Sequence, residues 1–523
     1  MTISEMLARN ARVYPEDSAL IELKPSEKIR KEITWKKFDE RANRIANALI
    51  NRGVGKGDKV IHLMMNSINW LEVYFGISRT GAWAVPLSFR FTSSDIKYCA
   101  DIAEAKVMIL GEEFIEKVEA IRSQLPTIKD YIFVGQNVPT GMEGFQDVLD
   151  KSSPESPGVV LNDEDACGLY FTSGTTGAPK PILLTHKNME CAAITENCHH
   201  YQKHEDNFIL LPPLYHTGAK MHWFGSLIVG ARATILTEIS PQYIFEAIHN
   251  ERGTIVWLLV PWAQDILGAM SRGELRKEDY DLSCWRLMHI GAQPVPPSLV
   301  KHWKEYFPDM QYDTNYGLSE ATGPGCVHLG IGNERKVGAI GKAGFNWETR
   351  IVDDQGEGVA QGQVGELLVK GSGVMKEYYK NPEKTAETIK NGWLYTGDMV
   401  RMDSEGFIYL VDRKKDVVIT GGENIYPVEI EDVLHSHPKI YDAGVIGIPD
   451  ERLGEIVAAV IDPKPGESLT EEEVNRFCEQ NLPRYKRPRR IIFDKVPRNP
   501  TGKIEKPKLR EKYVNKPNFH HSY

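Results

Sequence analysis

The sequence has few of the features that mark secreted, membrane-spanning or nucleic-acid-binding proteins. Its seven cysteines among 523 residues are scattered and odd in number, which fits reduced thiols rather than a disulfide framework. The longest apolar run, at 254–263, is far too short to span a bilayer, and the N-terminus lacks the apolar core of a signal peptide. A formal net charge of −9, with acids and bases interspersed, argues against a general nucleic-acid binder. These absences predict a cytoplasmic enzyme with no integral membrane segment, acting as a monomer or homodimer.

What the chain does contain is an alternation of strand and helix patterns. At 523 residues, 41% of them hydrophobic, it has room for two or more domains. Residues 34–52 predict an amphipathic helix with Thr34 as its N-cap. Strands and helices then alternate at short spacing to about residue 110, and again between 186 and 290. This alternation predicts an α/β protein with two parallel α/β subdomains, in which helices flank the sheets.

The pattern changes in the last third of the chain. After residue 338, short strands alternate with Gly- and Asp-rich turns, which predicts a small β subdomain. Further on, Pro427 fits the first position of a helix, and Thr470 fits the N-cap of a capping box. We therefore predict a large N-terminal domain over residues 1–413 and a small α+β C-terminal domain over 414–523.

The stretch from Tyr170 to Lys180 has the composition of a phosphate-binding loop. Apolar residues lead into a turn of Thr, Ser and Gly, where glycine exposes successive N–H groups that can form an anion-binding concavity. No Gly-Lys-Ser/Thr closes the stretch, so it is not a Walker A motif, and a plain turn is the alternative interpretation. The residues that we assign to phosphate binding are Thr172, Ser173, Gly174, Thr175, Thr176, Gly177 and Lys180.

Five further motifs follow along the chain. They are Gly291-Ala-Gln-Pro294, Asn315-Tyr-Gly-Leu-Ser-Glu320, Tyr395-Thr-Gly-Asp398, Asp412-Arg-Lys-Lys-Asp416 with Gly421-Gly-Glu-Asn-Ile-Tyr-Pro427, and Pro500-Thr-Gly-Lys503. Each is weak alone, but in this order the set resembles the adenylate-forming superfamily, in its acyl-CoA synthetase branch, over nearly the whole chain. The resemblance implies that a carboxylate attacks the α-phosphorus of ATP to give acyl-AMP and pyrophosphate. The thiol of coenzyme A then displaces AMP.

The resemblance also implies where ATP would lie. The Thr/Gly loop would hold the β- and γ-phosphates, and Glu320 would associate with Mg²⁺, a hard cation that suits carboxylate oxygens. Tyr316 would lie against adenine, opposite a backbone wall. That wall would consist of Gly291, Ala292 and Gln293, and the motif around Tyr316 adds Asn315, Gly317, Leu318 and Ser319 to the nucleotide site.

In this resemblance, two further residues would bind the ribose and a third would act in the chemical step. Asp398 would accept both ribose hydroxyls, since two vicinal donors match one carboxylate, and Arg413 would contact the ribose as well. Lys503 would reach both the attacking carboxylate and the α-phosphate, where its charge relieves their repulsion. The alternative for Lys503 is a solvated lysine in a basic tail.

The resemblance implies that the small C-terminal domain is mobile and acts twice, rotating between the two half-reactions. Lys415 stands at the hinge position, which absorbs the backbone change. After rotation, Gly421 and Gly422 would line the tunnel for the pantetheine arm of coenzyme A, because glycine permits close backbone approach. One departure from the family pattern is Pro181, since relatives commonly have glycine after the loop lysine. Proline removes one N–H donor there.

The sequence gives less information about the residues that line the acyl pocket. His216 resembles the residue that gates the carboxylate, and Ile290 stands where relatives often have glycine, which would narrow one side of the pocket. Lys220 either pairs with the second carboxylate of a diacid, or points to solvent or supports its helix. The other expected pocket walls are Thr217, Gly218, Gly317 and Thr322. Our leading substrate is a fatty, cyclic or aromatic monocarboxylate, and the reaction could also run in reverse to make ATP.

Several alternatives remain at this point. The class alternatives are an acyl-AMP ligase, an amino-acid-activating enzyme that loads a carrier protein, and a luciferase-like oxygenase. A group of cysteines and histidines resembles metal ligands by count, but we expect a packed helix instead, with the two cysteines on one face. The group consists of Cys191, Cys198, His199, His200 and His204.

Overall fold

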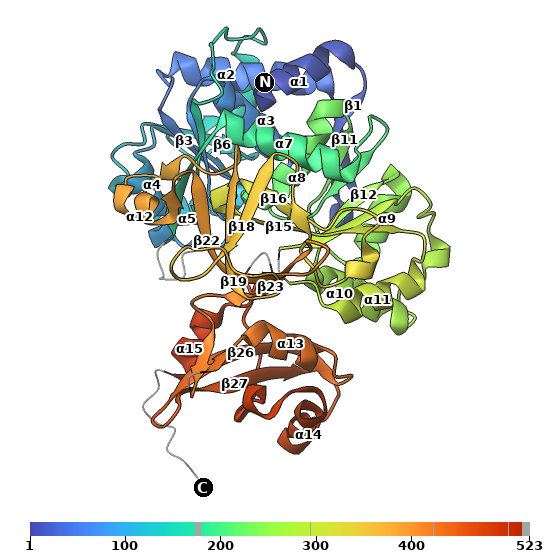
Figure 1. Cartoon of the computed structure of the whole chain (residues 1–523). Coiled ribbons are helices and arrows are strands. Elements are labelled where there is room, and N and C mark those ends of the chain that lie inside the picture. The colour runs from blue at the N-terminus through green and yellow to red at the C-terminus, as the bar shows by residue number, and fades with distance from the viewer. Residues whose placement is uncertain (173–178, 293, 422, 500–501, 515–523) are drawn as a thin grey trace.

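A computed structural model describes residues 1–172, 179–292, 294–421, 423–499 and 502–514. Figure 1 shows a large N-terminal domain with a smaller C-terminal domain, in orange and red, below it. The large domain contains two mainly parallel sheets with flanking helices and a separate group of antiparallel strands. The predicted fold class is therefore confirmed.

The first sheet has the strand order β20-β9-β8-β4-β3-β5-β6-β7. Its central strands pair in parallel, whereas β9 and β20 are antiparallel additions at one edge. The strands are β3 (Lys59–Leu63), β4 (Trp83–Pro86), β5 (Val107–Gly111), β6 (Asp130–Val134), β7 (Glu143–Gly144), β8 (Ala166–Thr172), β9 (Lys180–Thr185) and β20 (Glu377–Tyr378). The helices of this half are α2 (Trp35–Asn51), α3 (Ile68–Arg79), α4 (Ser93–Ala103), α5 (Ile115–Glu119) and α6 (Phe145–Asp150). Thr34 caps α2 through Lys37 N, as predicted.

The second sheet has the strand order β14-β13-β12-β10-β11-β1-β2. The strands are β1 (Ser18–Lys24), β2 (Ile29–Thr34), β10 (Asn207–Leu210), β11 (Arg232–Leu236), β12 (Ile255–Leu259), β13 (Leu287–Gly291) and β14 (Gln311–Asp313). The helices are α1 (Ile3–Val13), α7 (His186–His200), α8 (Thr217–Val229), α9 (Pro241–Glu251), α10 (Val260–Ser271) and α11 (Pro297–Tyr306). One hydrophobic core joins α2, α3, α7 and α8 to both sheets, and a second lies between this sheet and α9, α10 and α11.

The antiparallel strands form two smaller sheets, and the second of them lies after residue 338, where we expected a small β subdomain. One consists of β15 (Asn315–Leu318), β16 (Gly323–His328) and β17 (Lys342–Ala343). The other consists of β18 (Trp347–Val352), β19 (Gly365–Gly371), β21 (Ile389–Lys390), β22 (Trp393–Met402) and β23 (Ile408–Arg413), with α12 (Pro382–Thr388) nearby.

The C-terminal domain is a sheet covered by helices. Its strands are β24 (Val418–Thr420), β25 (Glu423–Ile425), β26 (Ile440–Asp450), β27 (Gly454–Pro463) and β28 (Arg490–Phe493). Its helices are α13 (Pro427–His435), α14 (Glu471–Asn481) and α15 (Lys506–Tyr513). Thr470 and Glu473 form the predicted capping box on α14, and Pro427 is the first residue of α13.

Candidate active site

The best-defined part of the site is a carboxylate held by two donors. Asp398 on β22 pairs in register with Arg413 on β23, and Arg413 Nε lies 2.9 Å from Asp398 Oδ1. Tyr316 on β15 donates its phenol hydrogen bond to the other oxygen, Asp398 Oδ2. The negative charge of Asp398 raises the pKa of Arg413. The pKa of Tyr316 is raised mainly by burial and, to a smaller extent, by the charge of Asp398. Three motifs distant in sequence therefore meet at one fixed carboxylate.

Glu320 lies where these strands meet the first sheet. It follows β15 in a short 3-10 turn, and its Oε1 accepts a hydrogen bond of 2.8 Å from the phenol of Tyr378. Tyr378 belongs to β20, which pairs with β9. The Glu320 carbonyl also accepts a hydrogen bond of 2.8 Å from Met375 N. The side chain is half-buried, so its carboxylate is both positioned and accessible to a ligand.

The Thr/Gly loop opens from the end of the β8–β9 hairpin. Thr172 pairs with Lys180 across the two strands, so the loop begins and ends at adjacent positions. Pro181 lies within β9 opposite Phe171, and its carbonyl accepts a hydrogen bond from Tyr379 N. The proposed phosphate ligands Ser173, Gly174, Thr175, Thr176 and Gly177 lie outside the described residues, so their roles stay predictions.

A second backbone segment reaches the site at the carboxyl end of β13. The strand ends at Gly291, and Ala292 follows with φ of 69°. A left-handed conformation is unfavourable for a residue with a Cβ, and such strain is often found at ligand sites. Gln293, the third residue of the predicted adenine wall, lies outside the described residues. Parallel α/β sheets bind ligands at this end of their strands.

The C-terminal domain adds Lys503 to this group. The turn that carries it is closed by Asn499, whose side-chain Oδ1 accepts from Lys503 N and whose N–H donates to the Lys503 carbonyl, both at 2.9 Å. The Lys503 side chain is exposed. Desolvation by the surrounding protein and then the charge of Arg413 lower the pKa of Lys503, whereas Asp398 and Glu320 raise it. Lys503 therefore lies within the electrostatic field of the residues assigned to the nucleotide.

His216 faces the same region from the second sheet. It is the N-cap residue of α8, and its ring lies 4.6 Å from that of Tyr215. Burial, followed by the charges of Lys220 and Lys503, lowers the pKa of His216 to about 3. The imidazole is therefore neutral at physiological pH, and it is close enough to Lys503 for the lysine charge to disfavour its protonated form.

Lys220 does not point to solvent, so that alternative was wrong. Its side chain is fully buried, and Nζ donates to the carbonyls of Leu214 and His216 at 3.2 Å each. The ammonium also lies 4.4 Å from the centre of the Tyr170 ring. Burial lowers the pKa of Lys220 well below its usual value. The lysine supports the segment that leads into α8, which was the other possibility given for a non-binding role.

Trp257 occupies the space behind the predicted carboxylate site, and sequence reasoning missed it. A Cβ on Gly218 would lie 3.2 Å from the Trp257 ring, and a Cβ on Gly291 would lie 3.9 Å from Trp257 Nε1. The ring stacks on His222 with centroids 4.0 Å apart. Ile290, which we expected to narrow the pocket, packs on the opposite face of β13 in the core beneath α9–α11. The structure thus places Trp257, rather than Ile290, beside Gly218.

Asn315 has a different environment from its neighbour Tyr316. Its side-chain amide donates to Glu196 Oε1 and lies 3.1 Å from His222 Nε2, within a buried polar cluster. Successive residues of a strand point to opposite faces, which explains why Tyr316 reaches Asp398 and Asn315 does not. Gly317 has no room for a side chain, because a Cβ there would lie 1.8 Å from the Gly323 carbonyl. Leu318 and Ser319 are half-buried beside it.

The boundary between the domains is held by a buried carboxylate. Asp412, at the end of β23, accepts a hydrogen bond of 3.0 Å from Val428 N in the first turn of α13. Lys506 Nζ lies 3.9 Å from Asp412 and 3.0 Å from Glu431. Burial raises the pKa of Asp412 to about 6, although Lys506 acts in the opposite direction. These contacts link the last strand of the large domain to the small domain.

The predicted hinge and tunnel residues lie just beyond this carboxylate. Lys415 is exposed. Gly421 has φ of 58°, and its N–H donates 2.8 Å to the Leu453 carbonyl. Gly422 is outside the described part of the chain. The hinge and tunnel roles stay predictions.

Comparison with known proteins identifies the group to which this arrangement belongs. The AMP-binding enzyme family matches residues 7–379, and the AMP-binding enzyme C-terminal domain matches residues 429–503. The chain belongs to the AMP-binding enzyme family. Its relatives are named as CoA ligases or synthetases, so this AMP-binding enzyme is a member of the adenylate-forming acyl-CoA ligases. ATP and coenzyme A are the substrates of that family.

Three similar proteins illustrate the range of this AMP-binding family. The chain is 32% identical to the long-chain-fatty-acid–CoA ligase FadD13 of Mycobacterium tuberculosis over 98% of each protein. It is 32% identical to a feruloyl-CoA synthase of an Amycolatopsis species over 92% of this chain and 94% of that one. Among solved structures, the anthranilate CoA ligase AuaEII with anthranoyl-AMP superimposes with a TM-score of 0.90 at 27% identity, over 98% and 97% of the two chains.

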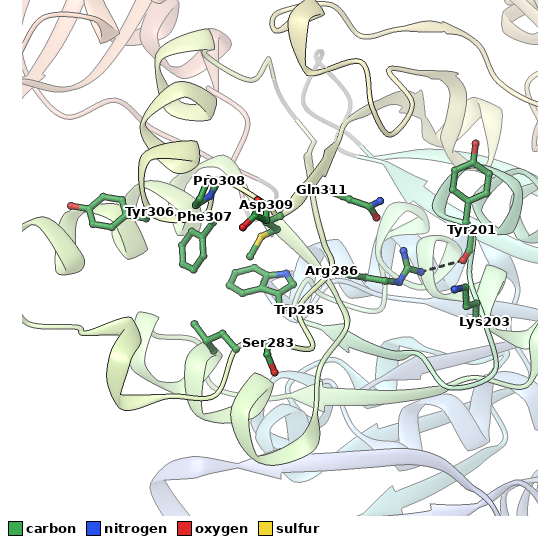
Figure 2. Close-up of a pocket in the computed structure, with 12 residues that line it drawn as sticks. Tyr201, Lys203, Ser283, Trp285, Arg286, Tyr306, Phe307, Pro308, Asp309 and Gln311 are labelled. Atoms are coloured by element: carbon green, nitrogen blue, oxygen red, sulfur yellow. Dashed lines mark hydrogen bonds between the residues drawn. The ribbon is translucent and has the colours of Figure 1, made fainter.

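A separate hollow of this AMP-binding enzyme lies away from the site (Figure 2). It has a volume of about 800 Å³, and its lining includes Trp285, Arg286 and Gln311. These residues stand at the amino ends of β13 and β14, whereas Gly291 and the nucleotide motifs are at the carboxyl ends. The hollow is therefore on the wrong edge of the sheet to be the active site.

Among the helices in the described ranges, none has the length and apolar character needed to cross a bilayer.

Proposed function

We propose that this enzyme activates a compact, ring-sized monocarboxylic acid as its acyl-adenylate and transfers the acyl group to coenzyme A. The position of Trp257 carries this proposal. Its indole stands between Gly218 and Gly291, behind the place where His216 would meet the carboxylate. A bulky buried ring in that position leaves room for a short or cyclic acyl group rather than a long extended chain.

The preference for one carboxylate over two rests on Lys220. A second carboxylate would need a positive partner in the acyl space. The Lys220 ammonium is already engaged by two carbonyl oxygens and an aromatic face, and its pKa is lowered by burial. Trp257 Nε1, in contrast, has no hydrogen-bond acceptor among the described residues. A ring bearing an oxygen substituent would satisfy that buried donor.

The chemical roles follow from the converging charges. Lys503 neutralises the repulsion between the attacking carboxylate and the α-phosphate, which is an electrostatic contribution. Asp398 accepts the ribose hydroxyls, and Arg413 and Tyr316 hold that carboxylate in place. His216, neutral because of its lowered pKa, lines the carboxylate site without adding charge.

Glu320 fits a role as the Mg²⁺ ligand. Its half-buried carboxylate supplies the hard oxygen donor that this cation prefers, and the Tyr378 phenol fixes its orientation. When bound, Mg²⁺ supplies charge neutralisation for the phosphates. In the second half-reaction the small domain rotates about Lys415, withdraws Lys503, and brings Gly421 and Gly422 toward the arm of coenzyme A. The same steps can run in reverse and form ATP from acyl-CoA, AMP and pyrophosphate.

A panel of acids tests this proposal directly. AMP release with coenzyme A should be fastest with benzoate-like and short cyclic monocarboxylates, and slower by about tenfold or more with long-chain fatty acids or dicarboxylates. Trp257→Ala should shift the preference toward longer acids, whereas Trp83→Ala, a change at a partly buried tryptophan at the amino end of β4, should not. A long-chain acid as the best wild-type substrate would overturn the compact pocket. Pyrophosphate release that yields acyl-AMP, with no transfer of the acyl group to coenzyme A, would favour an acyl-AMP ligase.

A further inference from the structure

A buried cluster of imidazoles and carboxylates lies behind the nucleotide site, on the far side of Asn315. Its side chains come from two helices and three strands of the large domain, and the relative exposure of each is 2% or less. Charged groups are rarely buried in this way unless they pair with each other or bind a metal. The members are Glu196 and His200 on α7, His222 on α8, His289 on β13, Asp313 on β14 and His328 on β16.

Three of these residues point one ligand atom each toward a common centre. His200 Nε2 lies 3.3 Å from Asp313 Oδ2, and His328 Nδ1 lies 3.2 Å from the same oxygen. The three atoms all lie within 4.8 Å of one another. In a tetrahedral site with bonds of about 2.0–2.1 Å, neighbouring ligand atoms are about 3.3 Å apart. The two measured separations match that spacing.

The opposite nitrogens of both histidines face one carboxylate. Glu196 Oε1 lies 3.2 Å from His328 Nε2, and Glu196 Oε2 lies 3.5 Å from His200 Nδ1. A metal-bound histidine typically donates its other N–H to a carboxylate, which fixes the tautomer. The third ligand is held similarly, because Asp313 Oδ1 accepts a hydrogen bond of 2.9 Å from Gly330 N.

Two atoms of the cluster have no hydrogen-bond partner in the described part of the chain. They are Glu196 Oε2 and His200 Nδ1, which face each other and are both buried. Suppose that the His200 ring carries its proton on Nε2 and donates it in a hydrogen bond to His289. Nδ1 then has no proton, and its lone pair faces a carboxylate oxygen of Glu196, which is an unfavourable contact. A cation bound at His200 Nε2 requires the ring proton to be on Nδ1. From there the N–H can donate a hydrogen bond to Glu196.

His289 is placed to be a fourth ligand. Its Nδ1 lies 3.1 Å from His200 Nε2 and 3.5 Å from Asp313 Oδ2. Its Nε2 faces His222 Nε2 at 3.0 Å, and the other nitrogen of His222 contacts the Gly218 carbonyl in the first turn of α8. The cluster is therefore continuous with the segment that carries His216.

We propose that His200, Asp313 and His328, with His289 beside them, bind one divalent transition metal ion, with zinc as the preferred ion. Imidazole nitrogens and a carboxylate oxygen are ligands that suit zinc, and enclosure on all sides fits a structural site rather than a catalytic one. The ion would balance the charge of two buried carboxylates. It would brace α7, β13, β14 and β16 directly behind Asn315 and Tyr316.

The proposed metal site is not the group of two cysteines and three histidines between residues 191 and 204 for which we expected a packed helix. Cys191 and Cys198 are seven residues apart on α7, so they share a face as we expected, but Cys191 is buried in a hydrophobic cluster whereas Cys198 is exposed. His199 stacks on the His328 ring and accepts a hydrogen bond from Phe345 N, and His204 faces Asp17 near the surface. Of that group, only His200 among the described residues joins the proposed site.

Metal analysis of the full-length protein tests the site without any measurement of activity. Wild type incubated with zinc and then desalted should retain one zinc ion per chain, and cobalt in its place should show the visible absorption of a low-symmetry site with nitrogen and oxygen ligands. A strong chelator should lower the Tm by several degrees, and zinc should restore it. His200→Gln and His328→Gln should lose the ion, whereas His302→Gln, a change at a surface histidine on α11, should keep it.

Failure of the variants to fold would leave the wild-type measurements decisive. Wild type that retains only traces of zinc or cobalt, with a Tm that neither metal nor chelator changes, would overturn the proposal and leave a proton-sharing network. Retention of zinc by both glutamine variants at the wild-type level would overturn the assignment of these ligands.

Discussion

Arg413 and Asp398 face each other across two antiparallel strands, with Arg413 Nε 2.9 Å from Asp398 Oδ1. Arg413 is on the last strand of the large domain, one residue beyond the Asp412 carboxylate that contacts the small domain. Arg413, which contacts the proposed ribose acceptor Asp398, and Asp412, which contacts the small domain, are therefore consecutive residues of β23. If the small domain rotates as we propose, the rotation would begin just after Arg413 and would leave the pair of Asp398 and Arg413 unchanged.

The phenol of Tyr316 supports the Asp398 carboxylate, so its removal should weaken nucleotide binding. In Tyr316→Phe we expect the KM for ATP to rise by about tenfold, because a hydrogen bond to a charged group contributes about 1.5–3 kcal/mol, while kcat changes less. Tyr409→Phe is the matched control, since its phenol also contacts a carboxylate, Asp403, in the same sheet. Equal KM values for the two variants in steady-state assays would contradict the role.

Lys503 should matter for only one half-reaction. Lys503→Ala should reduce acyl-AMP formation by about 10²–10³-fold, the usual cost of losing one charge-stabilising donor, while supplied acyl-AMP still reacts with coenzyme A. Pyrophosphate exchange and single-turnover thioester formation measure the two steps separately. Lys508→Ala removes an exposed lysine of the same tail and should leave both rates unchanged. Equal loss of both half-reactions in Lys503→Ala would disprove the assignment.

Lys415 should affect the opposite half-reaction. Proline fixes φ and removes an N–H, so Lys415→Pro should hold the small domain in one orientation. We expect pyrophosphate exchange near the wild-type rate and thioester formation slowed by at least about tenfold. Lys415→Ala keeps backbone freedom and serves as the control. If the proline variant forms thioester as fast as the alanine variant, the rotation does not occur at this residue.

Asp412 should make the stability of the protein depend on pH. Its native pKa of about 6 lies above the ordinary value of 3.8, so the folded state binds this proton more tightly than the unfolded state. The stabilisation is complete below about pH 4 and is lost as the pH rises through about 6. The difference corresponds to about 3 kcal/mol.

Asp412→Asn should remove this dependence. Calorimetric unfolding of the full-length variant at successive pH values from 4 to 6 should show a smaller decrease in Tm than wild type. Glu467→Gln, a change at an exposed carboxylate in a loop of the small domain, should retain the wild-type slope. Parallel curves for wild type and Asp412→Asn would show that this carboxylate is not the titrating group.

The elements with strong local signals could be predicted from sequence. Thr34, Thr470 and Pro427 mark helix starts through caps and a fixed φ, and the structure has helices at all three. The N-terminal hairpin is different. Nothing in the local pattern of β1 indicates that it pairs in parallel with β11, more than 200 residues later, because that pairing depends on which sheet edge is free.

In the candidate site, too, some features could be predicted from local sequence and others depend on long-range packing. The order of the motifs determined the family, the ATP-binding residues to test and the lysine to substitute, because each motif is a short local pattern. Only the tertiary structure decided that Lys220 is buried, that Trp257 rather than Ile290 stands beside Gly218, and that His200, Asp313 and His328 converge. Such meetings join strands and helices far apart in the chain. Their geometry arises from packing, which no single segment of the sequence encodes.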